Sequence, residues 1–238
     1  MGEVVSLLDR PVYTFREVDR LLGLNQDTTR RWVDGYRRTD KHYAPIVREE
    51  STGDRWVTWG EFTEVRLLSE YRDLDHIRIQ KLRIVVDHLR QEFGHRYPLA
   101  YAQPFLLPNG REILMRAQHA AELEDDLFVV VRTGQLVVTP RVERFVRAAT
   151  YEVDPVRPQE GKTIAVRFQA DPRYPDVTID PEHRSGRPTI VGRSILVTTL
   201  AEMVFAGDQV EDIATWYELT PDQVQQAVDF TATHNLVA

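Results

Sequence analysis

The sequence of 238 residues contains no cysteine. This excludes disulfides, thiolate nucleophiles and cysteine metal sites, and it suits a reducing compartment. No apolar run is long enough to span a bilayer, and the first residues lack the basic and then apolar stretch of a secretory signal. We therefore expect a cytoplasmic protein with no membrane segment.

Recognisable catalytic patterns are also lacking. The seven histidines are scattered, and no pair has zinc-ligand spacing with a third ligand nearby. "GKT" at 161–163 would need a glycine at position 156 to form a phosphate-binding loop, and that residue is Val156. The sequence shows no recognisable pairing of a nucleophilic side chain with a general base. We expect no enzyme activity, no cofactor and no metal site.

Charge is distributed unevenly along the chain, whose net charge is −7. Residues 1–97 hold 17 basic and 17 acidic side chains, which leaves 13 basic and 20 acidic side chains for residues 98–238. A locally basic but neutral first part and an acidic second part suggest modules with different partners.

The stretch "DTTRRWVDGYRR" at 27–38 concentrates four arginines around Trp32. Before it, Thr14 and Glu17 predict a capping box and a short helix that ends at Gly23. Asn25 is then the expected cap of a second helix over about 26–34, closed by a glycine. Two short helices joined by a glycine-containing turn are typical of a helix-turn-helix, with Trp32 facing the core.

A β-hairpin wing is predicted after these helices, because segments 46–49 and 55–58 flank the turn sequence "STGD". Arginines on such a unit neutralise DNA phosphates or contact base edges. The alternative is a solvated basic face on an ordinary helical bundle. The predicted DNA-binding residues are Thr28, Thr29, Arg30, Arg31, Tyr36, Arg37, Arg38, Arg48 and Arg55.

The rest of the chain predicts an α+β, mainly α fold. Thr58 and Glu61 form a second capping box before a helix, and a further helix ends at Gly94. Proline-rich residues 97–175 read as a β-rich connector, with strands at 127–131, 135–138 and 163–168. Three helices are expected to open at 199, 208 and 220. We predict a DNA-binding domain at 1–96, the connector at 97–175 and a trihelical domain at 176–238.

The C-terminal stretch resembles a small bacterial and archaeal domain family of formally unknown function that is associated with antitoxins. The resemblance rests on "GRPTIVGRSILV" at 186–197 and on "AGDQVEDIATWYELTPDQVQQA" at 206–227. The usual T-R-I-P-V of the family is replaced by Arg193–Val197, which lacks the proline and shifts the arginine.

The N-terminal stretch resembles a MerR-type winged helix, through "FREVDRLLGLNQDTTRRWVDG" and "GDRWVTWGEF". The combination resembles larger VapB-type antitoxins of actinobacteria. That resemblance implies a PIN-domain toxin, a magnesium-dependent ribonuclease, as partner, and a homodimer that represses its own operon at operator DNA. An antitoxin arginine entering an acidic PIN active site would compete with the metal. The candidates are Arg184, Arg187 and Arg193.

Two other functions remain open at the level of sequence. One is a MerR-like ligand-responsive transcriptional regulator whose β-rich segment encloses a small molecule. The other is an interaction scaffold whose helix-turn-helix has lost DNA affinity, because strong DNA binders are often clearly basic and residues 1–97 are neutral.

Overall fold

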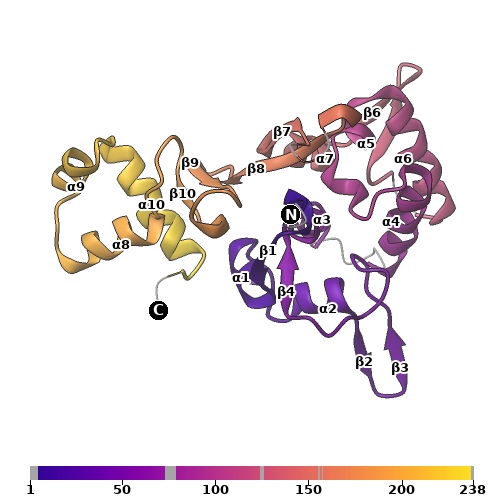
Figure 1. Cartoon of the computed structure of the whole chain (residues 1–238), viewed down its shortest axis with the longest axis horizontal. Helices are drawn as coiled ribbons and strands as arrows, with labels where there is room; N and C mark the ends of the chain where they lie inside the picture. Colours follow the sequence, from indigo (N-terminus) through magenta and orange to yellow (C-terminus); the bar gives the residue numbers. More distant parts are fainter. Residues whose placement is uncertain (1–4, 73–78, 124–125, 155, 157, 237–238) are drawn as a thin grey trace.

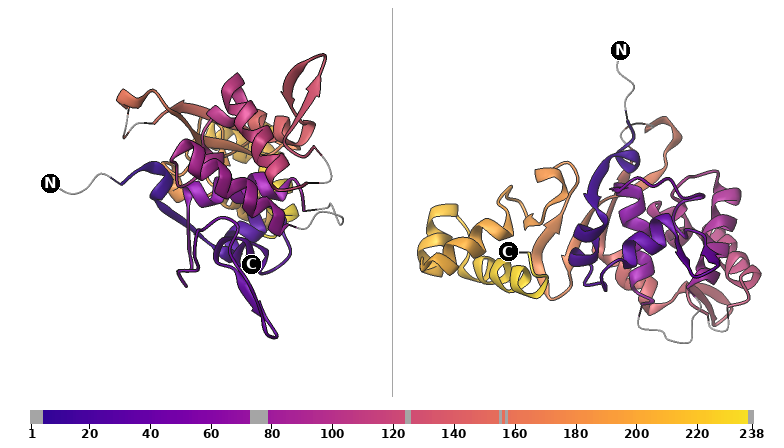
Figure 2. Two further views of the ribbon diagram at one scale, coloured as in Figure 1. Left: turned by 90° about the vertical axis from the view of Figure 1, so that its right-hand side faces the viewer. Right: turned by 90° about the horizontal axis from the view of Figure 1, so that it is seen from below.

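The computed structural model describes residues 5–72, 79–123, 126–154, 156 and 158–236. The fold is α+β and mainly helical, as the sequence predicted. The molecule is elongated, with α8–α10 at one end and α4 and α6 at the other (Figures 1 and 2). The first elements and a four-stranded sheet lie between these ends.

The N-terminal part contains the two predicted short helices. Thr14 and Thr58 each form the predicted capping box, with Glu17 and Glu61 respectively. The elements are β1 (Pro11–Thr14), α1 (Phe15–Leu21), α2 (Thr28–Asp34), β2 (Tyr36–Arg38), β3 (Lys41–Tyr43), β4 (Trp56–Thr58), α3 (Trp59–Ser69) and α4 (Gln80–Phe93).

The predicted hairpin of segments 46–49 and 55–58 is wrong. The backbone N–H groups of Ile46 and Val47 donate to the carbonyl of Trp32, at 2.7 and 3.0 Å, so this segment closes the end of α2. Strand β4 pairs instead with β1, which precedes the two helices. The hairpin that projects from the molecule is β2–β3, directly after α2 (Figure 1).

The middle of the chain is more helical than the predicted β-rich connector. The predicted strands are present, and β5 and β6 form a hairpin around Thr133 and Gly134. However, three helices accompany them, each with a proline in its first turn, where the missing N–H costs nothing. The elements are α5 (Gln103–Leu106), α6 (Pro108–Ala120), β5 (Val129–Arg132), β6 (Gln135–Val138), α7 (Pro140–Ala148), β7 (Ala149–Val153) and β8 (Thr163–Asp171).

The last part adds two strands and three helices. Strands β9 (Tyr174–Ile179) and β10 (Thr189–Ile190) complete an antiparallel sheet of order β10-β9-β8-β7. The boundary predicted between 175 and 176 falls within β9, and the division into three domains stays a prediction. The helices are α8 (Val197–Ala206), α9 (Val210–Tyr217) and α10 (Pro221–Thr233).

Of the three predicted C-terminal caps, only that of α10 is found. Thr220 and Gln223 form its capping box. Helix α8 begins two residues before Thr199, after Leu196, and α9 begins after Gln209. Neither Leu196 nor Gln209 makes a side-chain capping bond, so the starts of α8 and α9 depend on packing rather than on local sequence.

Helix α3 is the centre of the molecule. Every residue from Trp59 to Leu68 is buried, and the hydrophobic cluster around it extends from Leu7 to Phe230. The indole N–H of Trp59 donates to the carbonyl of Ala165 in β8 at 2.7 Å. The Tyr13 hydroxyl in β1 donates to the carbonyl of Gly186. The N-terminal elements are therefore joined to the sheet through buried contacts.

Candidate nucleic-acid interface

Helix α2 is fixed at its start by a side chain from α1. Asp19 accepts the backbone N–H of Thr29 at 2.8 Å and its hydroxyl at 2.6 Å, and both residues are buried. The predicted cap at Asn25 is therefore wrong, because Asp27 is the N-cap residue and makes no side-chain capping bond. Thr29 therefore holds the two helices together, and the prediction that it contacts DNA is corrected.

Trp32 anchors α2 in the core, as predicted. It is 8% exposed, and its carbonyl accepts the two N–H groups of Ile46 and Val47. The inward indole turns Arg30 and Arg31 toward solvent, where both are exposed.

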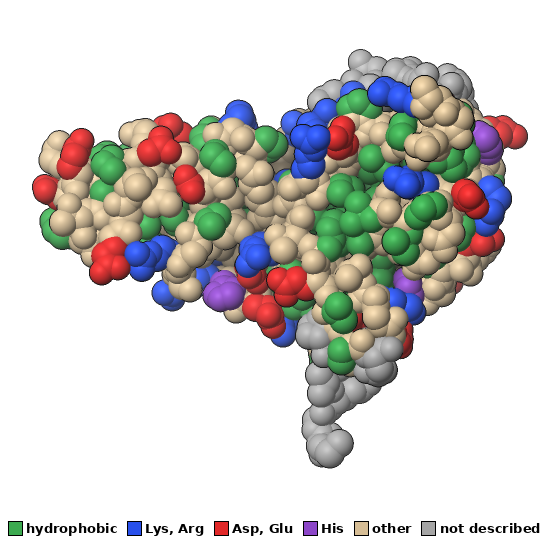
Figure 3. Space-filling view, turned by 90° about the horizontal axis from the view of Figure 1, so that it is seen from above, with side chains coloured by type: hydrophobic (Ala, Val, Ile, Leu, Met, Phe, Trp, Pro, Cys, Tyr) green, Lys and Arg blue, Asp and Glu red, His purple; other side chains and the backbone are tan. Residues whose placement is uncertain are grey.

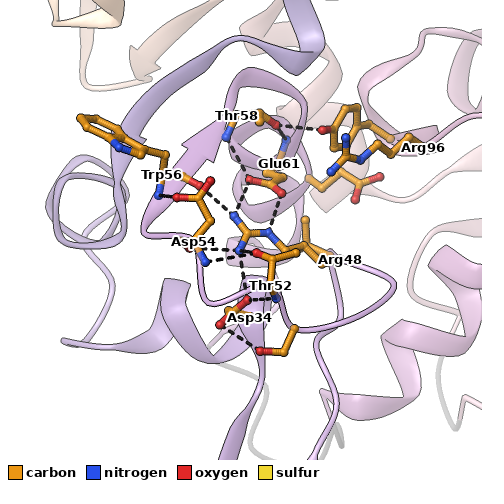
Figure 4. A network of polar contacts seen from close by, with 12 residues as sticks. Asp34, Arg48, Thr52, Asp54, Trp56, Thr58, Glu61 and Arg96 are labelled. Carbon is orange, nitrogen blue, oxygen red and sulfur yellow. Dashed lines mark hydrogen bonds and ion pairs between the residues drawn. The ribbon is translucent and has the colours of Figure 1, made fainter.

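A buried arginine network holds the end of α2 (Figure 4). Arg48 is 7% exposed. Its guanidinium donates to Glu61 from Nε at 2.7 Å and to Asp34 from Nη1 at 3.0 Å. It also donates to the Thr52 hydroxyl at 2.7 Å and to the Trp56 carbonyl at 2.7 Å. The prediction that Arg48 contacts DNA is therefore corrected: it is an internal brace.

Asp34 connects this network to the loop that follows it. Burial alone would raise the pKa of Asp34, but backbone N–H groups of Thr52 and Gly53, the Ser51 hydroxyl and Arg48 outweigh it and lower that pKa. The carboxylate thus stays ionised and ties residues 51–53 to the last turn of α2. Because β2 begins two residues later, the same contacts set where the hairpin leaves the body.

Five exposed cations cover α2 and the hairpin, and we call them the α2–hairpin cations. Only one of them has an ion pair within the part of the chain that the structure describes, Arg30 with Asp27 at 3.6 Å. Arg38 lies directly opposite Lys41 across β2–β3, and like charges placed in this way destabilise a hairpin. The five residues are Arg30, Arg31, Arg37, Arg38 and Lys41.

Two stacked tyrosines form the base of the hairpin. The rings of Tyr36 and Tyr43 lie 4.6 Å apart between centroids and are almost parallel, at 6°. The Arg31 guanidinium lies 5.9 Å from the centroid of Tyr36, so helix and hairpin are in contact at this point. Tyr36 is therefore half-buried and supports the cations.

The remaining predicted residues lie at the edge of this surface or outside it. Thr28 is half-buried at the first position of α2, and Arg55 is exposed on the loop before β4. Lys41 and His42 were missed in the sequence, although both are exposed on β3. Their signal is "YRRTDKHY", in which a Thr-Asp turn separates two short segments that each combine a tyrosine with at least one Lys or Arg.

The three arginines predicted to contact a toxin lie around the loop that leads to α8. Arg184 donates from Nε to the carbonyl of Ser194 at 2.7 Å. Arg193 pairs with Glu218 at 3.1 Å. Arg187 is exposed and has no ion pair among the described residues. The structure thus gives two of the three a local partner.

Clusters of metal ligands and membrane-spanning helices are not found in the described segments. No group of three or more potential metal ligands is present there. No helix among those residues has the length and apolar character needed to cross a membrane.

Comparison with known proteins relates this chain to a domain family, to curated proteins and to a solved structure. Residues 177–231 match the family described as "Protein of unknown function (DUF433)". The Mycobacterium tuberculosis protein called "Putative antitoxin VapB45" is 29% identical over 97% of this chain and 98% of its own length. The crystal structure of Rv2018 from Mycobacterium tuberculosis has a TM-score of 0.72 at 24% identity, and covers 94% of this chain and 100% of that one. The similarity to the Rv2018 structure supports the overall fold described above.

A further relative from the same organism is more similar in sequence. The Mycobacterium tuberculosis protein called "Uncharacterized protein Rv2308" is 39% identical over 98% of this chain and 95% of its own length. The chain therefore belongs to the family of Rv2308, and its C-terminal part matches the DUF433 domain family.

Proposed function

We propose that this protein is the antitoxin of a type II toxin–antitoxin system, which neutralises a PIN-domain ribonuclease toxin and represses its own operon by binding operator DNA. The observation that carries the DNA-binding part is the group of α2–hairpin cations, exposed on an otherwise acidic protein. The relative named as an antitoxin supports the toxin-binding part.

In this proposal α1 and α2 act as a helix-turn-helix and β2–β3 acts as its wing. Helix α2 enters the major groove with Arg30 and Arg31, and the hairpin places Arg37, Arg38 and Lys41 along the phosphate backbone. A homodimer presents two such units to a palindromic operator, at a separation of about 34 Å or a multiple of it, one turn of DNA.

Binding to the DNA upstream of the operon tests this directly. Replacing Arg30 and Arg31 together by alanine, or Arg37 and Arg38 together, should weaken operator binding by about tenfold or more and flatten its salt dependence. The matched control is Arg132→Ala, because Arg132 is also an exposed hairpin arginine but lies on β5. Equal operator affinity in all variants would contradict the proposal.

The C-terminal lobe, α8–α10, has a charge unlike that of α2 and the hairpin. After Arg193 the chain contains no lysine or arginine, and acidic side chains are spread over this lobe in Figure 3. Phe205 and Trp216 are each 58% exposed there. Aromatic side chains surrounded by carboxylates suit a cationic protein surface rather than DNA, and a ribonuclease that binds RNA needs such a surface. The lobe's carboxylates are Glu202, Asp208, Glu211, Asp212, Glu218, Asp222 and Asp229.

Co-purification with a PIN-domain protein encoded next to this chain tests the toxin part. Phe205→Ser with Trp216→Ser should release that protein while leaving operator binding intact. Arg187→Ala should reduce inhibition of the ribonuclease if Arg187 reaches its active site, whereas Arg193→Ala should have less effect because Glu218 already holds Arg193. Unchanged co-purification and inhibition in every variant would remove this lobe as the toxin-binding surface.

A second candidate function is a MerR-like ligand-responsive regulator. It is favoured by one observation, an arginine-lined pocket whose walls include the ends of α1 and α3, helix α7 and His234. Saturable stabilisation by a small ligand, with no toxin partner, would favour this function over the antitoxin.

A further inference from the structure

A pocket of about 410 Å³ lies where distant parts of the chain meet. Its walls come from the end of α1, the end of α3, helix α7, the turn between β8 and β9, and His234 after α10. Five arginines from three of these segments line it: Arg66, Arg72, Arg141, Arg144 and Arg173.

Arginines outnumber carboxylates among the described residues that line this pocket. Among its described lining residues the five arginines face two carboxylates, Glu70 and Asp171. Glu70 pairs with Arg144 at 2.9 Å, and Asp171 pairs with Arg173 at 2.6 Å. Both carboxylates are thus engaged with arginines of the lining.

Arg66 is the buried member of the group. It is 9% exposed, and its two terminal nitrogens donate to the neutral carbonyls of Ala170 and Gln169, at 3.1 and 2.9 Å. Its Nε is buried and has no hydrogen-bond partner in the part of the chain that the structure describes. Burial lowers the pKa of Arg66 to about 10, because nearby carboxylates offset the loss of hydration only in part. An anion in the pocket would supply the missing counter-charge.

We propose that this pocket binds a small phosphorylated molecule. Guanidinium groups recognise phosphate oxygens through paired, planar hydrogen bonds, so several arginines around one space favour phosphate over a single carboxylate. The volume suits a compact ligand, because small-molecule pockets span about 300–1,000 Å³. The ligand would contact α1, which packs on α2, and also the end of α10, so its binding joins the DNA-binding elements to the acidic lobe.

Thermal unfolding and calorimetry of the full chain test the site. The probes are inorganic phosphate, pyrophosphate and ATP, each at an ionic strength held constant with sodium chloride. At least one probe should raise the melting temperature by several degrees in a saturable way. Phosphate alone would indicate a free-anion site, whereas a preference for pyrophosphate or ATP would indicate a nucleotide. No saturable shift with any of them would overturn the proposal.

Three variants assign the effect to the pocket. Arg144→Gln with Arg173→Gln removes two half-exposed arginines and should weaken binding at least tenfold. The matched control, Arg132→Gln with Arg147→Gln, removes two exposed arginines that do not line the pocket and should bind like the wild type. Glu70→Gln removes a competing carboxylate and should tighten binding several-fold, which a merely destabilised protein would not do.

The proposal would also be overturned if the arginine cluster contacted DNA instead of a small ligand. If the Arg144 and Arg173 variant loses operator affinity while all three probes bind neither variant nor wild type, the cluster contacts the DNA backbone and is not a small-molecule site. Because ligand binding is measured without DNA or toxin, this outcome is distinct from failure of the proposed antitoxin function.

Discussion

At the scale of single residues, Arg48 gives the most direct prediction. Arg48→Ala leaves Glu61, which is 1% exposed, without its buried ion partner. Breaking a buried pair from one side costs about 3–5 kcal/mol, so the free energy of unfolding from urea titration should fall by that order. Arg55→Ala is the control and should change it by about 0.5 kcal/mol or less. If Arg48→Ala left stability unchanged but weakened DNA binding, Arg48 would be a DNA contact after all.

A second residue, Glu64, should make stability depend on pH. Burial raises its pKa to about 8, and Arg90, 3.6 Å away, counteracts this only in part. An unfolded glutamate has a pKa of about 4.3, so the folded state retains a proton that the unfolded chain releases. The stabilisation present at low pH is therefore lost as the pH rises from about 4 to 8, by at most about 1.4 kcal/mol per pH unit.

Glu64→Gln isolates this effect. Glutamine keeps the oxygen that accepts the Leu99 N–H at 3.2 Å but does not titrate. Urea unfolding at pH 5.5, 6.5 and 7.5 should give a flatter dependence for the variant than for the wild type. Parallel curves would mean that Arg90 keeps Glu64 ionised.

Residue roles were predictable where their partners are close in sequence. The caps at Thr14 and Thr58 were found because each partner lies three residues away. Thr29 and Arg48 were misassigned because their hydrogen-bond acceptors are distant in sequence. Asp19, which binds Thr29, lies 10 residues away, and Glu61, which binds Arg48, lies 13 residues away. A sequence pattern shows that a side chain is charged or polar, but not which distant group neutralises it.

At the scale of elements, the C-terminal caps provide a paired test. Thr220→Ala removes the capping bond of α10 and should lower the free energy of unfolding by about 1 kcal/mol. Thr199→Ala should cost less, because Thr199 lies inside α8 and caps nothing. Both are measured by urea titration. A larger loss at Thr199 would show that it contributes through packing.

The element types were predicted better than their order in space. Amphipathic spacing and capping boxes gave α3, α4 and α10, and apolar runs gave β5, β6 and β8. Helices α5, α6 and α7 were missed because Pro104, Pro108 and Pro140 suggested interruption, whereas each lies in the first turn of a helix. The pairing of β1 with β4 is not local, so no short pattern could reveal it.

At the scale of the whole molecule, the central position of α3 predicts cooperative unfolding. Trp59 contacts β8 and Tyr13 contacts Gly186, so the N-terminal elements and the sheet share one core. Circular dichroism and tryptophan fluorescence should therefore report coincident urea transitions, although the chain was predicted to contain three domains. Two separated transitions would support independent domains. Tyr13→Phe, which removes a buried hydrogen bond, should lower the common midpoint.

The segregation of charge has a consequence for how the molecule approaches a polyanion. Cations project on α2 and β2–β3, while α8–α10 carry only carboxylates and lie elsewhere along the long axis (Figure 1). Such a separation of charge gives the molecule an electric dipole, on which the field of a nucleic acid would exert a torque before any contact forms. If the protein binds DNA as proposed, it would arrive already oriented, hairpin foremost, with the exposed aromatic side chains of the α8–α10 lobe still accessible to a toxin.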